Sequence, residues 1–121
     1  MARILHPHDA ELLKLRGRSA RQVLSGDDTD NQMTVRLVQV EPEVGIAETR
    51  PLHVHHGVGE FIWILEGNGL VHSAQGVEPA GEGDCVYVAP GELHKIVPSG
   101  NEPPHLLCVF PTGDIAARTK E

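Results

Sequence analysis

The sequence predicts an all-β fold of about eight short strands with little helix, arranged as a sandwich or a small barrel. Three observations lead to this prediction. Apolar and polar residues alternate over short segments, as in half-buried strands. The chain's 13 glycines and 9 prolines mark turns at close spacing. A helical period appears only near the N-terminus. With 121 residues, the chain has the length of one domain, predicted to span 1–121.

The first expected element is a short helix over 10–16, where Asp9 can cap the start and Gly17 can end it. A possible strand follows over 19–24, and then a polar loop of turn-forming residues over 25–31. The first strong strand prediction is 33–40, because its apolar positions alternate between two faces.

The remaining strands are expected in short pieces separated by glycine-rich turns. Gly67 begins a Gly-Asn-Gly sequence that predicts a tight hairpin requiring positive φ, and 81–84 predicts a second tight turn. The tail after Pro111 is polar, so we expect docking alone to order it. The expected strands are 52–56, Glu60–Glu66, 70–73, Cys85–Val88, 94–97 and His105–Phe110.

Composition excludes several classes of protein. Ten basic against 17 acidic residues leave a net charge of −7, which argues against binding to nucleic acid or to anionic membrane. Apolar runs such as 61–65 are far too short to span a bilayer, and the N-terminus lacks the apolar core of a signal peptide. Cys85 and Cys108 are expected to be buried thiols in a reducing compartment, so we expect a cytoplasmic protein.

Eight histidines are the unusual feature of the composition, and four residues form a candidate metal site. His53 and His55 project from the same strand face, about 6–7 Å apart at Cα. Glu60 follows a short glycine-containing loop, and His94 opens a later strand. Each histidine by itself is weak evidence for a metal site, because strand ends and turns often carry unrelated polar residues. Together they form a nitrogen and oxygen donor set suited to Mn, Fe, Ni, Cu or Zn.

The spacing of these residues resembles the two motifs of the cupin family. His53-x-His55-x4-Glu60-x6-Gly67 matches the first motif, over about 45–67, with Gly45 two positions farther upstream than usual. Gly83, Pro90, Gly91 and His94 match the second, over about 83–98. Ala89 stands where proline is usual and Pro98 where asparagine is usual, and both departures affect turns rather than ligands.

This resemblance implies a single cupin domain with a jelly-roll β-barrel, often dimeric. It implies that His53, His55, Glu60 and His94 hold one divalent transition metal ion. His56 is adjacent to His55 and is expected to point the opposite way, toward the rim. The roles of His72, His105 and Tyr87 stay open.

An open metal in a dry pocket suits a small organic molecule with a chelating pair of oxygens. Ile62 and Ile64 share the strand face of Glu60 and are expected to line that pocket. Arg36 and Arg50 are possible anion partners, although a solvated surface role is favoured for each.

Three functions are compatible with the pattern. The first is a dioxygenase-type oxidoreductase, because the full three-His-one-Glu set resembles quercetin and acireductone dioxygenases, with Glu60 as the catalytic residue. The second is a non-redox isomerase, decarboxylase or lyase that uses the metal as a Lewis acid. The third is a non-catalytic ligand-binding or sensory module.

The segment 61–65 is apolar on both faces of its strand. Such a strand is covered on both sides, either by a second layer of the same chain or by a partner subunit. We therefore expect a homodimer.

Overall fold

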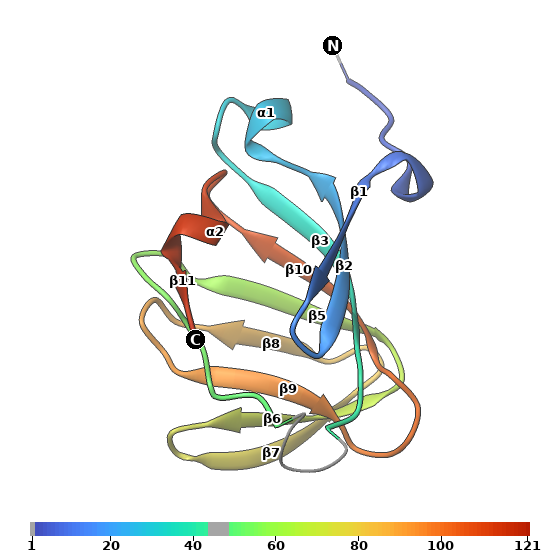
Figure 1. Ribbon diagram of the computed structural model, residues 1–121, viewed down its shortest axis with the longest axis vertical. Coiled ribbons are helices and arrows are strands. Elements are labelled where there is room, and N and C mark those ends of the chain that lie inside the picture. The colour runs from blue at the N-terminus through green and yellow to red at the C-terminus, as the bar shows by residue number, and fades with distance from the viewer. Residues whose placement is uncertain (1, 44–48) are drawn as a thin grey trace.

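The computed structural model describes residues 2–43 and 49–121, and within them the chain forms antiparallel sheets with three short helical turns (Figure 1). The predicted all-β class is confirmed. Gly45, assigned to the first motif, lies outside the described residues. The large sheet has the order β1 (Glu11–Leu15), β2 (Arg18–Leu24), β3 (Thr34–Val40), β10 (His105–Phe110), β5 (Glu60–Glu66) and β8 (Cys85–Val88).

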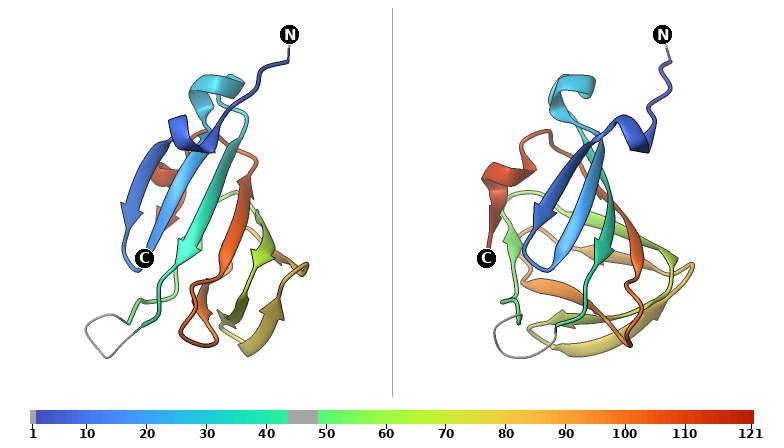
Figure 2. Two further views of the ribbon diagram at one scale, coloured as in Figure 1. Left: turned by 90° about the vertical axis from the view of Figure 1, so that its right-hand side faces the viewer. Right: turned by 45° about the vertical axis from the view of Figure 1, so that its right-hand side comes forward.

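A smaller sheet faces part of the large one, and a third sheet has two short strands. The small sheet has the order β7 (Gly76–Gly81), β6 (Asn68–Ser73) and β9 (His94–Pro98), and β4 (Val54–His55) pairs with β11 (Thr119–Lys120). Figures 1 and 2 show the small sheet at one end of the molecule, opposite the helical turns η1 (Pro7–Asp9) and α1 (Gly26–Thr29). No helix among the described residues is long and apolar enough to cross a membrane.

The core lies between the two larger sheets, as expected for a jelly-roll arrangement. Alternation along β3 and β5 turns every second side chain inward, as the sequence predicted for Ile62 and Ile64. Side chains from β6 and β7 in the small sheet pack against this cluster from the other side. Its buried members include Val38, Val40, Ile62, Ile64, Val88, Ile96, Leu106, Phe110 and Ile115.

The helix expected over 10–16 is wrong, because these residues form the strand β1. Leu13 and Leu15 pack against the core while Lys14 points outward, and β1 pairs with β2 through a two-residue turn closed by Gly17 at φ +72. A helix of seven residues has little stability of its own, so pairing with β2 outweighs the capping signals. The glycine that was expected to end the helix instead turns a hairpin.

Two other local predictions also fail. The expected loop at 25–31 contains the turn α1, where the backbone N–H and hydroxyl of Ser25 both donate to Asp28 Oδ2, at 3.0 and 3.1 Å. Gly67 has the positive φ that was predicted, +87, but β5 and β6 do not pair as a hairpin. They belong to different sheets, so Gly67 carries the chain from one sheet to the other.

The strand β7 was not predicted, and one cysteine was misplaced. Residues 76–81 mix glycine, glutamate and proline, a composition that fits a strand only at a sheet edge, where β7 lies.

Cys85 is exposed, whereas Cys108 is buried as expected. The register explains the difference, since Cys85 lies opposite the outward Trp63 and Cys108 opposite the inward Ile62. The polar tail does dock, as expected: it forms α2 (Ile115–Arg118) and β11.

The outer face of the large sheet is apolar across β3, β10 and β5. Its side chains on β5 are 38–43% exposed, although the inward residues of that strand are buried. The registers place Leu107 opposite both Leu37 and Trp63, and Val109 opposite both Val35 and Phe61. We call this surface the outer apolar face, formed by Val35, Leu37, Phe61, Trp63, Leu65, Leu107 and Val109.

The contrast between the two faces of β5 can be measured by truncation. Ile64 is fully buried and Leu65 is 43% exposed. We expect Ile64→Ala to lower the free energy of unfolding by about 2–5 kcal/mol, because it removes buried methyl groups and leaves a cavity. Leu65→Ala is the matched control, with an expected loss below about 1 kcal/mol. Urea denaturation measures both, and equal losses would contradict the packing described for β5.

Candidate metal centre

Two of the predicted ligands, His53 and His94, are held by one pair of backbone hydrogen bonds. The N–H of His53 donates to the carbonyl of His94, and the N–H of His94 donates to the carbonyl of His53, each at 2.9 Å. This antiparallel bridge lies just before β4 and at the first residue of β9. Directly opposed residues of a bridge project to the same side, and the two rings lie 4.2 Å apart between centroids.

His55 is positioned by the C-terminal strand. It lies in β4 opposite Thr119 of β11, and its carbonyl accepts the N–H of Gly91 at 2.9 Å. Its ring centroid is 5.1 Å from those of His53 and His94. The strand alternation therefore aims His53 and His55 at one point, as the sequence predicted.

Glu60 approaches the three histidines from the large sheet. It is the first residue of β5 and is 5% exposed. Its Oε1 lies 3.2 Å from His55 Nε2 and 3.1 Å from His94 Nε2. One donor atom from each of the four residues lies within 4.8 Å of the others, so His53, His55, Glu60 and His94 could hold a metal ion.

Hydrogen bonds on the far side of two histidines determine which ring nitrogen carries the proton. The carbonyl of Glu92 can only accept, so His94 Nδ1, 2.9 Å away, donates to it. The hydroxyl of Thr119 gives its proton to the carbonyl of Ile115 at 2.7 Å and therefore accepts from His55 Nδ1 at 2.9 Å. In the neutral rings, Nε2 of both histidines is unprotonated, and its lone pair faces inward.

These inward lone pairs test whether the group fits a metal. In the neutral rings, Nε2 of His55 and of His94 both face the carboxylate oxygen of Glu60, which is also an acceptor, so a metal ion between them would bind all three atoms. Metal bonds of about 2.1 Å separate adjacent ligand atoms by about 3 Å at right angles, close to the 3.1 and 3.2 Å observed here. Outer hydrogen bonds of this kind orient histidine ligands in metalloproteins. The residues fit a divalent ion.

Two pKa shifts favour the protonation states that bind metal. Burial lowers the pKa of His53 to about 3, aided by the nearby charges of His94 and Arg18. Burial alone would raise the pKa of Glu60, but the interaction of its carboxylate with His55 and His94 outweighs burial and lowers the pKa to about 2. At neutral pH the group therefore offers a neutral imidazole and a carboxylate, and neither has to lose a proton to bind an ion.

The four residues line one wall of a cavity of about 60 Å³. A water molecule needs about 10–15 Å³ measured in this way, so the cavity holds about four to six water-sized groups. Its remaining lining is mostly apolar, but three arginines also reach it: Arg18, Arg36 and Arg50. Ile62 lines the cavity as expected, but Ile64 does not. The apolar wall consists of Leu15, Val38, Val40, Ile62, Ile96, Leu106 and Phe110.

The solvated role expected for Arg50 is wrong. Arg50 is 3% exposed and donates from Nη2 to the carbonyl of Ile96 at 2.7 Å, while its Nε has no hydrogen-bond partner among the described residues. Glu43 accepts hydrogen bonds from the Arg50 backbone N–H and from Lys95. The sequence analysis missed this buried ion cluster, because Lys95 lies on β9, far along the chain from Glu43 and Arg50. Arg36 is half-buried and lines the cavity.

The other candidate residues lie away from the metal-ligating group. His56 is exposed, as its position next to His55 predicted, and His105 is exposed at the start of β10. His72 lies half-buried on β6, and Tyr87 is 67% exposed. Thr119 was also missed. A threonine in a polar tail carries no signal of its own, and only the pairing of β11 with β4 shows its role.

Comparisons with known proteins agree with this geometry. The family described as "Cupin domain" matches residues 38–110. An uncharacterized protein of Methanocaldococcus jannaschii is 35% identical over 74 residues, which cover 61% of this chain and 59% of that relative's length. A sugar phosphate isomerase from a cupin superfamily, from Silicibacter pomeroyi, is 26% identical with a TM-score of 0.70, covering 90% of this chain and 75% of its own.

A second similar structure supports the fold alone. It is described as a predicted oxalate decarboxylase from Thermotoga maritima, with 22% identity and a TM-score of 0.75, covering 91% of this chain and 99% of the other. Its high coverage shows that the arrangement of both larger sheets is shared along nearly the whole length of the two chains.

The metal-ligating group can be tested by elemental analysis. We expect His94→Ala to lose bound metal, because it removes a ligand from a group of four. His56→Ala is the matched control, since that ring is exposed and adjacent to a ligand, and it should keep the metal content of the wild type. Equal metal content in both variants would contradict the assignment of His94.

Proposed function

The chain belongs to the cupin family, and from that premise we propose that it is a metal-dependent enzyme acting on a small organic molecule. The observation that carries the proposal is the convergence of four buried donors, His53, His55, Glu60 and His94, on one wall of a small cavity. The histidine lone pairs point inward, toward the cavity side of the group. A small molecule that chelates through oxygen atoms is the substrate class that this arrangement favours.

The protein's own residues have separate tasks in this proposal. A divalent ion held by the three histidines and Glu60 would supply Lewis-acid or redox chemistry to the chelating substrate. Thr119 and the carbonyl of Glu92 keep His55 and His94 in the ligating orientation. The apolar wall excludes water from the substrate and strengthens electrostatic interactions inside the cavity.

Glu60 is the proposed catalytic residue, and two tasks are open to its carboxylate. As a ligand it reduces the net charge of the centre, which tunes redox potential or Lewis acidity. Displaced by a chelating substrate, it can take a proton as a general base. Both tasks need a carboxylate, and an amide of the same size serves neither.

The leading reaction that we propose is dioxygenase-type oxidation of a small enol, diketone or phenolic compound. The nitrogen-rich donor set is suited to redox-active Fe, Cu, Mn or Ni, and the apolar cavity wall protects a reactive substrate from water. Consumption of oxygen with substrate is the measurement that separates this reaction from non-redox chemistry.

A second candidate is a non-redox reaction such as isomerisation or decarboxylation. The observation that favours it is the 26% identity over 90% of this chain with the structure described as a sugar phosphate isomerase. A lyase that uses a tyrosine base has less support, because Tyr87 is 67% exposed and is the chain's only tyrosine.

The two unpaired thiols support a location in the cytoplasm. Cys85 is exposed and Cys108 is buried, and neither forms a disulfide. An exposed free thiol persists most readily where the compartment is reducing, so we propose a cytoplasmic enzyme.

Glu60→Gln separates catalysis from metal binding. We expect the variant to retain much of its metal through the three histidines but to lose about 10²-fold or more in turnover, the scale of a lost general base. The assay is oxygen uptake and product analysis with a panel of chelating substrates, after elemental analysis of protein purified without added metal. Wild-type turnover in Glu60→Gln with metal intact would reduce Glu60 to a structural ligand. Tight binding without turnover of any substrate would favour the sensory module.

We also propose that a second copy of the chain covers the outer apolar face. Seven apolar side chains form this surface, six of them in adjacent cross-strand positions, and Phe61, Trp63 and Leu65 are more than a third exposed there. Contiguous exposed apolar surface of this kind marks interaction sites. Self-association through matching surfaces is the commonest form of assembly for a soluble chain.

Trp63→Lys tests this assembly, because a charge at the centre of an apolar interface is costly and buried tryptophans dominate interface energies. We expect the wild type to be dimeric at micromolar concentration and the variant to dissociate at least about 10-fold more readily. Light scattering and sedimentation measure both. Val77→Lys is the control, since Val77 is 51% exposed on β7, away from this face. A monomeric wild type would contradict the proposal.

A further inference from the structure

We propose that Arg36, with Arg18 beside it, forms an oxyanion-binding subsite on the cavity wall, so that the ligand of this cavity carries a carboxylate or phosphate group. The inference rests on the proposed function only in taking the cavity as the substrate site. It adds the chemical class of the substrate and assigns the group that binds its charged end.

The register of the large sheet places Arg36 on the cavity side. Arg36 lies opposite Gln22 of β2 and opposite Cys108 of β10, and Cys108 lies opposite Ile62 of β5. Glu60 is two residues before Ile62 and shares its inward face. Arg36 and the metal-ligating carboxylate therefore project into the same cavity from different strands, and both line it.

Arg36 has no carboxylate partner among the described residues within ion-pair distance. Its Nε donates to Gln22 Oε1 at 3.0 Å, and its guanidinium carbon lies 5.8 Å from the centroid of the Phe110 ring. No hydrogen bond joins its two terminal nitrogens to the described part of the chain. Burial lowers the pKa of Arg36, while the carboxylates of Glu60 and Glu11 raise it from beyond ion-pair distance.

An unpaired guanidinium in a half-buried position is costly unless something neutralises it. The two terminal nitrogens form a planar fork that matches two oxygens of a carboxylate or phosphate. The Nε bond to Gln22 fixes the plane of that fork. The geometry thus leaves free the pair of donors that recognises an oxyanion.

Neighbouring charges reinforce the subsite. Arg18 also lines the cavity, and its charge acts on Arg36, Arg50 and His53. Arg18 is 3.3 Å from Glu121 and Arg50 is 3.6 Å from Glu43, so Arg36 is the cavity arginine without an acidic partner among the described residues.

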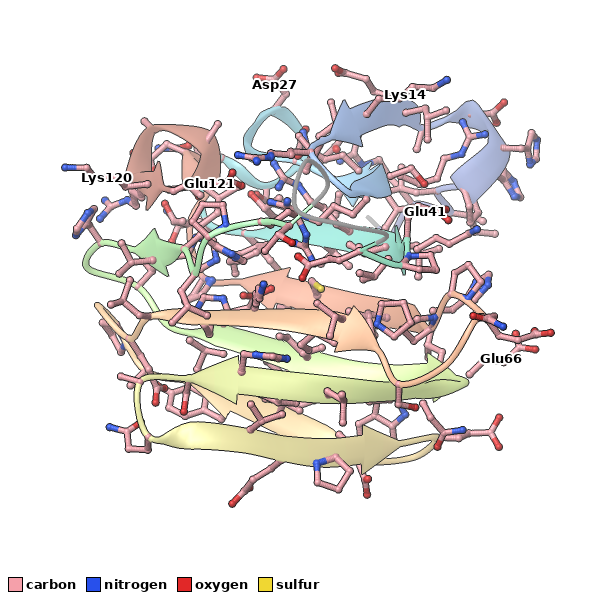
Figure 3. All side chains as sticks on the ribbon, turned by 60° about the horizontal axis from the view of Figure 1, so that its bottom comes forward. Lys14, Asp27, Glu41, Glu66, Lys120 and Glu121 are labelled. Atoms are coloured by element: carbon pink, nitrogen blue, oxygen red, sulfur yellow. The ribbon has the colours of Figure 1, made fainter. Side chains whose placement is uncertain are left out.

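Arginine side chains gather at the cavity although the whole chain has a net charge of −7. Three arginines and the carboxylate of Glu60 line it, and two of the arginines have acidic partners outside this lining. Many other charges point outward, as Figure 3 shows for Lys14, Asp27 and Glu66. A low-dielectric cavity of this kind attracts anions more strongly than a solvated surface does.

The test uses the protein as purified, with its metal content measured, and three probes. Malonate and inorganic phosphate carry oxyanions, and malonamide is the neutral analogue of malonate. We expect calorimetric or NMR titration to show binding of at least one anion and much weaker binding of malonamide. Arg36→Met should weaken anion binding by about 10- to 100-fold, the value of a charge-assisted pair of hydrogen bonds. Whether malonate or phosphate binds more tightly identifies the class of oxyanion.

Arg21→Met is the matched control, because this substitution removes the same charge from the opposite face of the sheet. Arg21 lies on β2 next to Gln22. It should bind anions like the wild type. Arg36→Lys keeps the charge without the fork and should fall between the wild type and Arg36→Met, and it provides the test if Arg36→Met does not fold. Unchanged anion affinity in Arg36 variants that keep their metal and melting temperature would overturn the proposal.

The two proposals fail in different ways. Anion binding that depends on Arg36, without turnover of any substrate, would remove the enzyme and leave the subsite. Turnover that depends on Glu60, with anion affinity that is equal in the wild type and Arg36→Met, would remove the subsite and leave the enzyme.

Discussion

The site depends on the two backbone hydrogen bonds that join His53 to His94. These residues are 41 positions apart, and no local element can bring them together. The bridge sets their side chains on one side of the chain at a fixed separation. Once it forms, β9 is aligned beside β4, and Glu60 needs only to enter from the opposite sheet to complete the donor set. Backbone pairing, rather than attraction between the side chains, thus holds these two of the four metal-ligating residues in place.

The cavity carries negative and positive side chains at different places: the carboxylate of Glu60 lies among the metal-ligating histidines, and the arginines lie on other strands. Glu60 is held as a carboxylate between two histidines, while the arginines approach from β2, β3 and the segment before β4. Apolar side chains separate these two groups and keep the local dielectric low, so each charge acts over a longer distance than in water. The proposed substrate, a chelating oxyanion, would be complementary both to a metal ion held at Glu60 and to the arginines.

The ligands could be predicted because their spacing is a local property: His53 and His55 alternate on one strand, and Glu60 opens the next. The same alternation correctly predicted that Ile62 and Ile64 on β5 point inward. The failures concern pairing between distant segments. Residues 10–16 have helical signals, but hydrogen bonding to β2 makes them a strand. Gly67 has the expected φ, but the two sheets that it joins are visible only in three dimensions. Arg50 is buried because Glu43 and the Ile96 carbonyl surround it, and no sequence pattern marks such a cluster.

The contact between Thr119 and His55 couples the C-terminal segment to the metal-ligating group. Thr119 holds the ring of His55 through a hydrogen bond, β11 pairs with β4, and Ile115 anchors α2 in the core at 2% exposure. An ion held by His55 would therefore be linked to the docking of this segment, and the two would stabilise each other by the same free energy. The resistance of residues 115–120 to proteolysis would then report metal occupancy without any substrate.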